Sequence, residues 1–162
     1  MKRKPTFTSW IGSICTAGRT ESTPEDTIGD LAYELKSLLH HCRVDREVRK
    51  AHVALVNEAS GLDMDADEGL FDGETDIIAR LVEALDHYAP PYTYFGKNSE
   101  AEYGFWPDLD LHSCDEPARI EAGLEHKEYW GGEDVALVND HGNVSCGRFD
   151  KRGRFHSYWS AV

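Results

Sequence analysis

In the first half of the chain, apolar residues recur every three or four positions, which predicts helices with one buried face. The first begins at Thr23-Pro24 with acids in its first turn, and the second begins at the capping residue Asp45 and ends at Gly61. The last of them stops before Pro90-Pro91, because proline cannot continue a helix. The three expected helices cover about Thr23–Cys42, Asp45–Gly61 and Glu74–Tyr88.

The second half changes to short aromatic and β-branched runs separated by turn residues, which is typical of antiparallel strands. One segment, Pro117–Tyr129, has Ile120 and Leu124 at helical spacing and predicts a helix. The fold class expected is α+β: an N-terminal helical bundle followed by an antiparallel four- to five-stranded sheet with one helix. The expected strands are Tyr92–Phe95, Tyr103–Trp106, Val135–Val138, Val144–Phe149 and Phe155–Val162, the last three forming a β-meander.

We therefore expect a helical region over residues 1–58 and an acidic α+β region over 59–162, with one compact domain as the alternative. The 162 residues fit either arrangement. The aromatic residues between positions 92 and 106 are expected to build a core rather than to stack on nucleic-acid bases, because carboxylates flank them.

Charge narrows the classes of partner. The chain has 17 lysines and arginines against 30 aspartates and glutamates, a formal net charge of −13. The acids concentrate in the middle, with ten acids and one base in Glu58–Asp86 and eleven acids and three bases in Lys97–Asp134. This balance excludes the basic surface of an ordinary DNA or RNA binder. We expect no direct contact with nucleic acid.

Two further features indicate a cytoplasmic protein with no membrane partner. No apolar run approaches the roughly 20 residues that span a bilayer. The four cysteines are irregularly spaced and lack a Cys-x-x-Cys pair, which is typical of free thiols in a reducing compartment.

The sharpest local pattern lies between the second and third predicted helices and resembles a calcium loop. Calcium loops of the EF-hand kind need oxygen ligands at positions 1, 3, 5 and 12, because carboxylates replace the ion's water shell. Glu68 stands where such loops need glycine, and Phe71 stands at a position that usually supplies an oxygen. An acidic, solvated loop is therefore expected, with no cofactor, and a calcium site is the alternative. Its ligands would be Asp63, Asp65, Asp67, Gly69 and Glu74.

Candidate catalytic groups are incomplete. The eight histidines have no paired zinc-ligand spacing, and Cys146 with His141 forms no recognisable hydrolase motif. No glycine-rich phosphate loop is present in the sequence. We expect no enzymatic activity.

Two short elements carry a family resemblance. Phe7-Thr8-Ser9-Trp10-Ile11 and Thr27-Ile28-Gly29-Asp30-Leu31-Ala32 resemble the YozE-type sterile-alpha-motif-like domains of bacteria, over about Thr6–Ala54. The resemblance implies a small helical bundle and a role in interaction rather than chemistry. The remainder, including Tyr103-Gly104-Phe105-Trp106, is similar to uncharacterised proteins of phages and mobile elements.

Together these features predict a non-catalytic acidic binding protein of phage or mobile-element origin. Its partner would be a basic protein or nucleoprotein complex that handles nucleic acid, with the carboxylates acting as a DNA mimic or anti-defence inhibitor. Self-association into a homo-oligomer is compatible with this function. A calcium-binding module built on the Asp63–Glu74 loop is the alternative. The expected partner-binding residues are Asp108, Asp110, Asp115, Glu116, Glu121 and Glu125.

Overall fold

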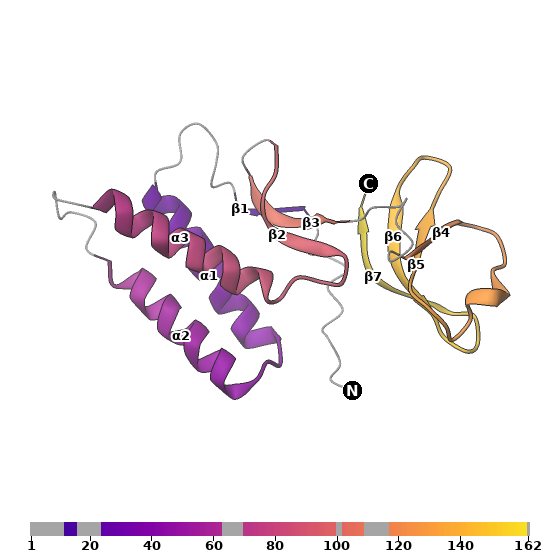
Figure 1. Ribbon diagram of the computed structural model, residues 1–162, viewed down its shortest axis with the longest axis horizontal. Coiled ribbons are helices and arrows are strands. Elements are labelled where there is room, and N and C mark those ends of the chain that lie inside the picture. The colour runs from indigo at the N-terminus through magenta and orange to yellow at the C-terminus, as the bar shows by residue number, and fades with distance from the viewer. Residues whose placement is uncertain (1–11, 16–23, 63–69, 100–101, 109–116, 162) are drawn as a thin grey trace. The chain divides into compact units, whose positions relative to one another are not determined.

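A computed structural model describes residues 12–15, 24–62, 70–99, 102–108 and 117–161 of the chain. Within these residues the backbone forms three helices, two β-sheets and one short 3-10 helix (Figure 1). The predicted α+β class is confirmed. The chain divides into two compact units. The helical unit is built from described residues between 13 and 89 and between 95 and 106, and the sheet unit from those between 90 and 94 and from 107 onward.

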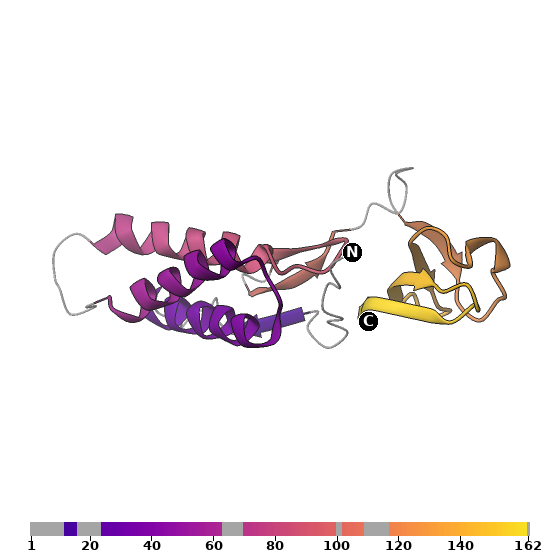
Figure 2. The same ribbon diagram turned by 90° about the horizontal axis from the view of Figure 1, so that it is seen from below.

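The helical unit contains α1 (Pro24–His41), α2 (Arg46–Ser60) and α3 (Leu70–Asp86). Helix α1 packs against both α2 and α3, and the three helices lie side by side in Figures 1 and 2. The expected domain boundary after residue 58 lies inside this unit, because α3 packs against α1.

The helices form where the apolar stripe of the sequence predicts them. In α1, Leu31, Leu35 and Leu38 are completely buried, and burying one leucine side chain contributes roughly 1.5–3 kcal/mol. Asp45 caps α2 as expected, since its carboxylate accepts a hydrogen bond from the Glu47 backbone N–H at 2.9 Å. The remaining buried apolar side chains of the three helices include Ile28, Leu39, Leu55, Val56, Ile77, Leu81 and Leu85.

A three-stranded sheet also belongs largely to the helical unit, in the order β1 (Gly12–Cys15), β3 (Tyr103–Pro107) and β2 (Thr93–Lys97). Phe95, Tyr103 and Phe105 are buried, and the ring centroids of Phe95 and Phe105 lie 5.0 Å apart. These three aromatic residues therefore build a core, as predicted, whereas Tyr94 is 38% exposed. The Phe95 backbone N–H donates to the Asp86 carboxylate at 2.7 Å, which ties β2 to the end of α3.

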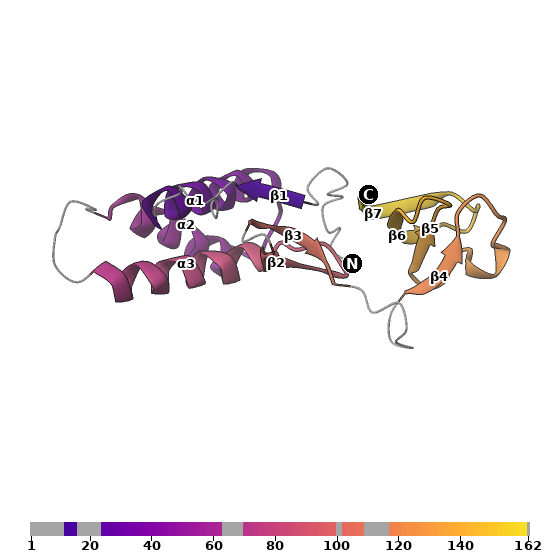
Figure 3. The same cartoon turned by 90° about the horizontal axis from the view of Figure 1, so that it is seen from above.

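The sheet unit contains four strands in the order β4 (Ala118–Glu121), β5 (Val135–Val138), β6 (Val144–Phe149) and β7 (Phe155–Ala161). Figure 3 shows β4 and β7 at opposite edges of this sheet. Strands β5, β6 and β7 form the predicted antiparallel meander. Trp159 on β7 is completely buried, and its indole N–H donates to the Pro91 carbonyl at 2.8 Å.

Three details of the predicted β architecture are wrong. The strands form two sheets rather than one antiparallel sheet, and β4 pairs with β5 in parallel. The helix expected over Pro117–Tyr129 is instead strand β4, a turn and the 3-10 helix η1 (Lys127–Tyr129). Ile120 is buried opposite Leu137, whereas Leu124 is 62% exposed, so the two never share a helical face. Gly123 adopts a φ of 92°, which ends the strand in a turn that a side chain would strain.

Candidate functional site

Half of the predicted partner-binding carboxylates fall within the described residues, and all of those are exposed. Asp108 directly follows β3, and Glu121 ends β4. Glu121 is two positions from the exposed Arg119 on the same strand, so the same face of β4 carries both signs of charge. Glu125 forms an ion pair with Lys127 at 3.2 Å. Asp110, Asp115 and Glu116 lie outside the described residues.

The predicted calcium loop begins after α2, and its last five residues, Leu70–Glu74, belong to helix α3. Asp63, Asp65, Asp67 and Gly69 lie outside the described residues. Glu74 is part of the first turns of α3. Among the histidine, cysteine and carboxylate side chains that the structure describes, no three lie close enough together to hold a metal ion.

A polar cluster in the sheet unit is centred on the Asp134 carboxylate. Tyr92 donates its hydroxyl to one carboxylate oxygen at 2.9 Å, and Tyr158 donates to the other at 2.7 Å. Arg148 lies against the same oxygen as Tyr158, with its Nη2 at 2.8 Å and its Nε at 3.0 Å. The backbone of Tyr92 has a φ of 61°, which a tyrosine rarely adopts. These bonds hold the strained segment before β2 against the four-stranded sheet, which belongs to the same unit.

The electrostatics of this cluster favour a structural brace over a catalytic group. Burial, with the Asp134 carboxylate beside it, raises the pKa of the Tyr158 hydroxyl to about 12. The same causes raise the pKa of Tyr92 above its usual range. Both hydroxyls are therefore protonated at neutral pH and donate to Asp134, whose two oxygens are occupied by three partners. Neither a nucleophile nor a free general base remains in the cluster.

A second titratable cluster lies in the helical unit, between α2 and the segment after α3. The His52 Nδ1 and the Tyr88 hydroxyl are 2.9 Å apart, and the His52 and His87 rings are 5.7 Å apart. Burial and the neighbouring His87 lower the pKa of His52. Burial also raises the pKa of the Cys42 thiol to about 11. Cys42 is thus a buried neutral thiol rather than an activated nucleophile.

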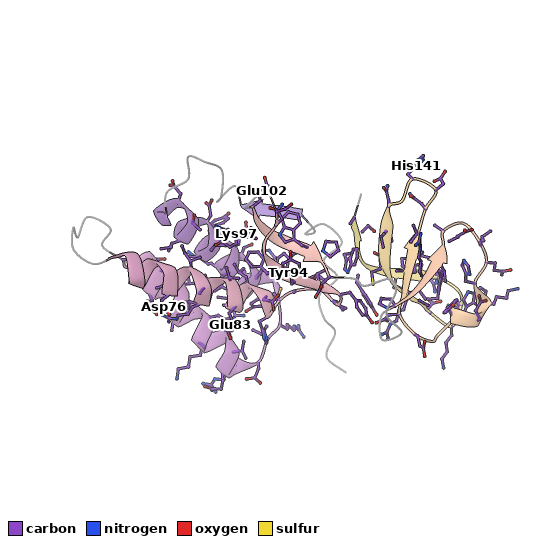
Figure 4. The ribbon with its side chains drawn as sticks, turned by 45° about the horizontal axis from the view of Figure 1, so that its top comes forward. Asp76, Glu83, Tyr94, Lys97, Glu102 and His141 are labelled. Atoms are coloured by element: carbon purple, nitrogen blue, oxygen red, sulfur yellow. The ribbon has the colours of Figure 1, made fainter. Side chains whose placement is uncertain are left out.

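The Cys146 and His141 side chains are placed in contrasting surroundings. Cys146 on β6 is completely buried. His141 lies in the exposed turn between β5 and β6, where Figure 4 shows it at the tip. Of these two candidate catalytic residues, Cys146 therefore lies in the core and His141 in solvent.

The polar side of α1 combines an exposed carboxylate, Asp30, and a half-buried one, Glu34, with an exposed aromatic ring. Tyr33 is 70% exposed, although large aromatic side chains bury 150–250 Å² when they have somewhere to pack. Asp30 and Glu34 lie on either side of it in sequence, and burial together with the Asp30 carboxylate raises the pKa of Glu34. No lysine, arginine or histidine among the described residues forms an ion pair with Asp30 or Glu34.

Gly29 lies on the same face of α1 and, having no side chain, leaves the helix backbone uncovered there. It lies four residues before Tyr33 in the middle of an exposed helix surface, where glycine costs about 1 kcal/mol relative to alanine. A Cβ built at Gly29 would meet no atom within 4 Å. Packing among the described residues therefore gives no reason for a glycine here. We call Gly29, Asp30, Tyr33 and Glu34 the α1 face.

Helix α3 carries a second set of exposed acids. Asp76 and Glu83 are seven residues apart, which places them on one side of the helix (Figure 4). Arg80 lies between them and contacts Asp76 at 3.4 Å, but its main partner is Glu58 of α2 at 2.7 Å. Asp76 and Glu83 are thus carried by one helix, which holds them in a defined spacing.

The α1 face was not among the residues predicted from the sequence to bind a partner. The signal that marks it is positional: a tyrosine falls on the polar side of the apolar stripe, with a carboxylate three residues before it. Acid density alone predicts a partner-binding site at residues 108–125, where described cations lie among the acids.

Comparison with protein-family models, curated proteins and solved structures finds no match to this chain. None of the helices in the described part of the chain is long and apolar enough to cross a bilayer.

Proposed function

We propose that this protein is a non-catalytic binding protein whose acidic α1 face engages a basic protein that itself handles nucleic acid. The observation that carries the proposal is the exposed Tyr33 beside Asp30 and Glu34, none of which has a cationic partner among the described residues. Tyrosine and arginine are enriched among the residues that dominate binding energy at protein interfaces.

The chemistry of the α1 face favours an arginine-rich partner. An arginine side chain can stack on the exposed Tyr33 ring while its guanidinium bonds the Asp30 carboxylate. A cation beside Glu34 would also offset the burial and the repulsion from Asp30 that together raise the pKa of Glu34. The missing side chain at Gly29 lets a partner backbone approach the helix closely. Surfaces rich in arginine and lysine are typical of proteins that bind nucleic-acid phosphates.

The test is capture from a lysate followed by competition. Proteins retained by the immobilised chain are identified by mass spectrometry, and the binding of each purified candidate is then titrated at ~50 and ~200 mM salt. We expect a basic nucleic-acid-binding protein whose affinity falls steeply with salt, because exposed charges are screened. Duplex DNA should displace the chain from it.

Three charge-reversed variants locate the surface. Asp30→Lys with Glu34→Lys reverses the α1 face, and Asp108→Lys with Glu121→Lys reverses the segment predicted from the sequence. Glu133→Lys with Asp140→Lys makes the same change of charge at exposed positions of the sheet unit and is the matched control. The proposal requires a loss of affinity in the first variant that the control does not share. Equal losses in all three variants would reduce the effect to net charge and remove the α1 face from the interface.

A further inference from the structure

A groove whose charge is opposite to that of the α1 face lies between α1 and α2. It has a volume of about 210 Å³. The residues that α2 contributes recur every three or four positions from Arg49 to Ser60 and so form one side of the helix. At 1.5 Å per residue, this side runs along the groove for about 16 Å.

The floor of the groove is apolar. Leu39 of α1 and Val56 of α2 are buried beneath it. Val53 faces the same groove and is 41% exposed, which makes it one of the few large apolar side chains of the described residues that reach solvent. Covering Val53 would remove apolar surface from water at a gain of roughly 25 cal/mol per Å².

The rim of the groove is cationic, although the chain has a net charge of −13. Lys36 and His40 extend from α1, and Arg49 from α2, and all three are exposed. No carboxylate of the described residues forms an ion pair with any of them. Through Lys36 and Arg49 the groove therefore presents unpaired positive charge beside apolar surface.

Size and charge together indicate the class of ligand. The volume is below the roughly 300–1,000 Å³ of pockets that enclose a drug-sized molecule, but it can accept an apolar side chain. An elongated groove between two helices is the geometry in which an amphipathic helix of a partner docks. Nucleic acid is disfavoured, because its backbone would also meet the acids that dominate the rest of the chain.

We propose that this groove binds an acidic amphipathic helix of a partner protein. An apolar side chain of that helix covers Val53, and flanking carboxylates face Lys36 and Arg49. This site goes beyond the basic-partner surface on the α1 face, because it uses different residues and the opposite charge. The protein would then hold two partners of opposite charge on one helical unit.

The experiment is selection from a displayed library of alanine-rich helical peptides, randomised on one face, against the full chain. Fluorescence anisotropy then measures the affinity of the enriched peptides for four variants. Arg49→Glu and Val53→Asp alter the groove. Lys50→Glu and Ala54→Asp make the same changes at the next positions of α2, which are exposed and do not line it.

We expect enriched peptides to carry aspartate or glutamate beside one or two large apolar residues. Arg49→Glu should weaken their binding about tenfold or more, because it places like charges together. Lys50→Glu and Ala54→Asp should have less than about a third of that effect. No enrichment, enrichment of basic peptides, or equal losses from Arg49→Glu and Lys50→Glu would each overturn the proposal.

Discussion

Replacing Asp134 by alanine removes the acceptor at the centre of the brace in the sheet unit. The two tyrosine hydroxyls then lose a charged acceptor, at 2.9 Å from Tyr92 and 2.7 Å from Tyr158. A hydrogen bond to a charged group contributes about 1.5–3 kcal/mol, and the lower value is appropriate beside solvent. Arg148 is nearly half exposed and can turn to water, so its loss adds less than ~1 kcal/mol. Asp134→Ala should therefore lower the free energy of unfolding by about 3–4 kcal/mol.

The assay is equilibrium unfolding in urea, followed by tryptophan fluorescence. Trp159 is completely buried in the same unit and should report its unfolding. Asp140→Ala is the control, since Asp140 is an exposed turn carboxylate and substitutions at such sites usually change stability by less than about 0.5 kcal/mol. Tyr158→Phe and Tyr92→Phe should each cost about 1.5 kcal/mol, and each should cost little more once Asp134 is absent.

The same brace predicts how stability depends on alkaline pH. The pKa of Tyr158 is about 12 in the folded chain and ~10 in the unfolded chain, so the unfolded state loses its proton first. Its contribution to stability is complete below pH ~10 and is lost as the pH rises to about 12. Tyr158→Phe should flatten this decline. If Asp134→Ala costs no more than Asp140→Ala, and Tyr158→Phe leaves the alkaline decline unchanged, the network does not brace the unit.

Four further outcomes are expected. Gly29→Ala should raise the free energy of unfolding by about 1 kcal/mol in urea titrations while weakening capture of the basic partner; a helix destabilised by this change would show that the position has an internal packing role. Because burial and His87 lower the pKa of His52, acidification below pH ~6.5 should lower the melting temperature of the chain, and His52→Gln should reduce that loss. Ending the chain before Phe155 should leave it insoluble in expression tests, since it exposes the edge of β6 and removes Trp159 from the core. Millimolar calcium should leave the melting temperature unchanged relative to a chelator, because two positions of the Asp63–Glu74 loop do not fit the calcium pattern; a rise that Glu74→Gln erases would establish a calcium site.

The helices could be predicted from sequence because their signals are local. The apolar stripe of α1 places Leu31 and Leu35 four residues apart, and both are fully buried. Asp45 and Gly61 were expected to bound the second helix, and they cap α2 at its two ends. Caps and periodicity act within one or two turns, so the rest of the chain does not need to be known.

The pairing of β4 could not be predicted in the same way. Its residues Ala118–Glu121 have a spacing that also fits a helix, and only the parallel partner β5 decides between the two. That partner follows after a turn, η1 and the Gly131-Gly132 pair. Parallel pairing depends on such a crossover, which no periodicity in the strand itself reveals.

The brace around Asp134 left no signal in the sequence at all. Its four members, Tyr92, Asp134, Arg148 and Tyr158, are separated by ten or more residues, and each is an ordinary residue of its segment. Only the pairing of β6 with β7 and the return of the segment before β2 bring them together. A network of this kind is a consequence of tertiary structure rather than a motif.

The charged residues show most clearly why counting acids and bases along the sequence does not describe the surface of the folded chain. Acid density predicts a partner site at residues 108–125, whereas the stretch from Lys36 to Lys50 mixes five lysines and arginines with Asp45 and Glu47. The fold separates what the sequence mixes: the α1–α2 groove takes Lys36 and Arg49 without either acid. Since a helix brings every third or fourth residue together, a stretch that carries both signs of charge can present a cationic rim on one face. An acidic chain can therefore carry a site for an acidic ligand, and the charge reversals at Arg49 and Asp30 test the two surfaces independently.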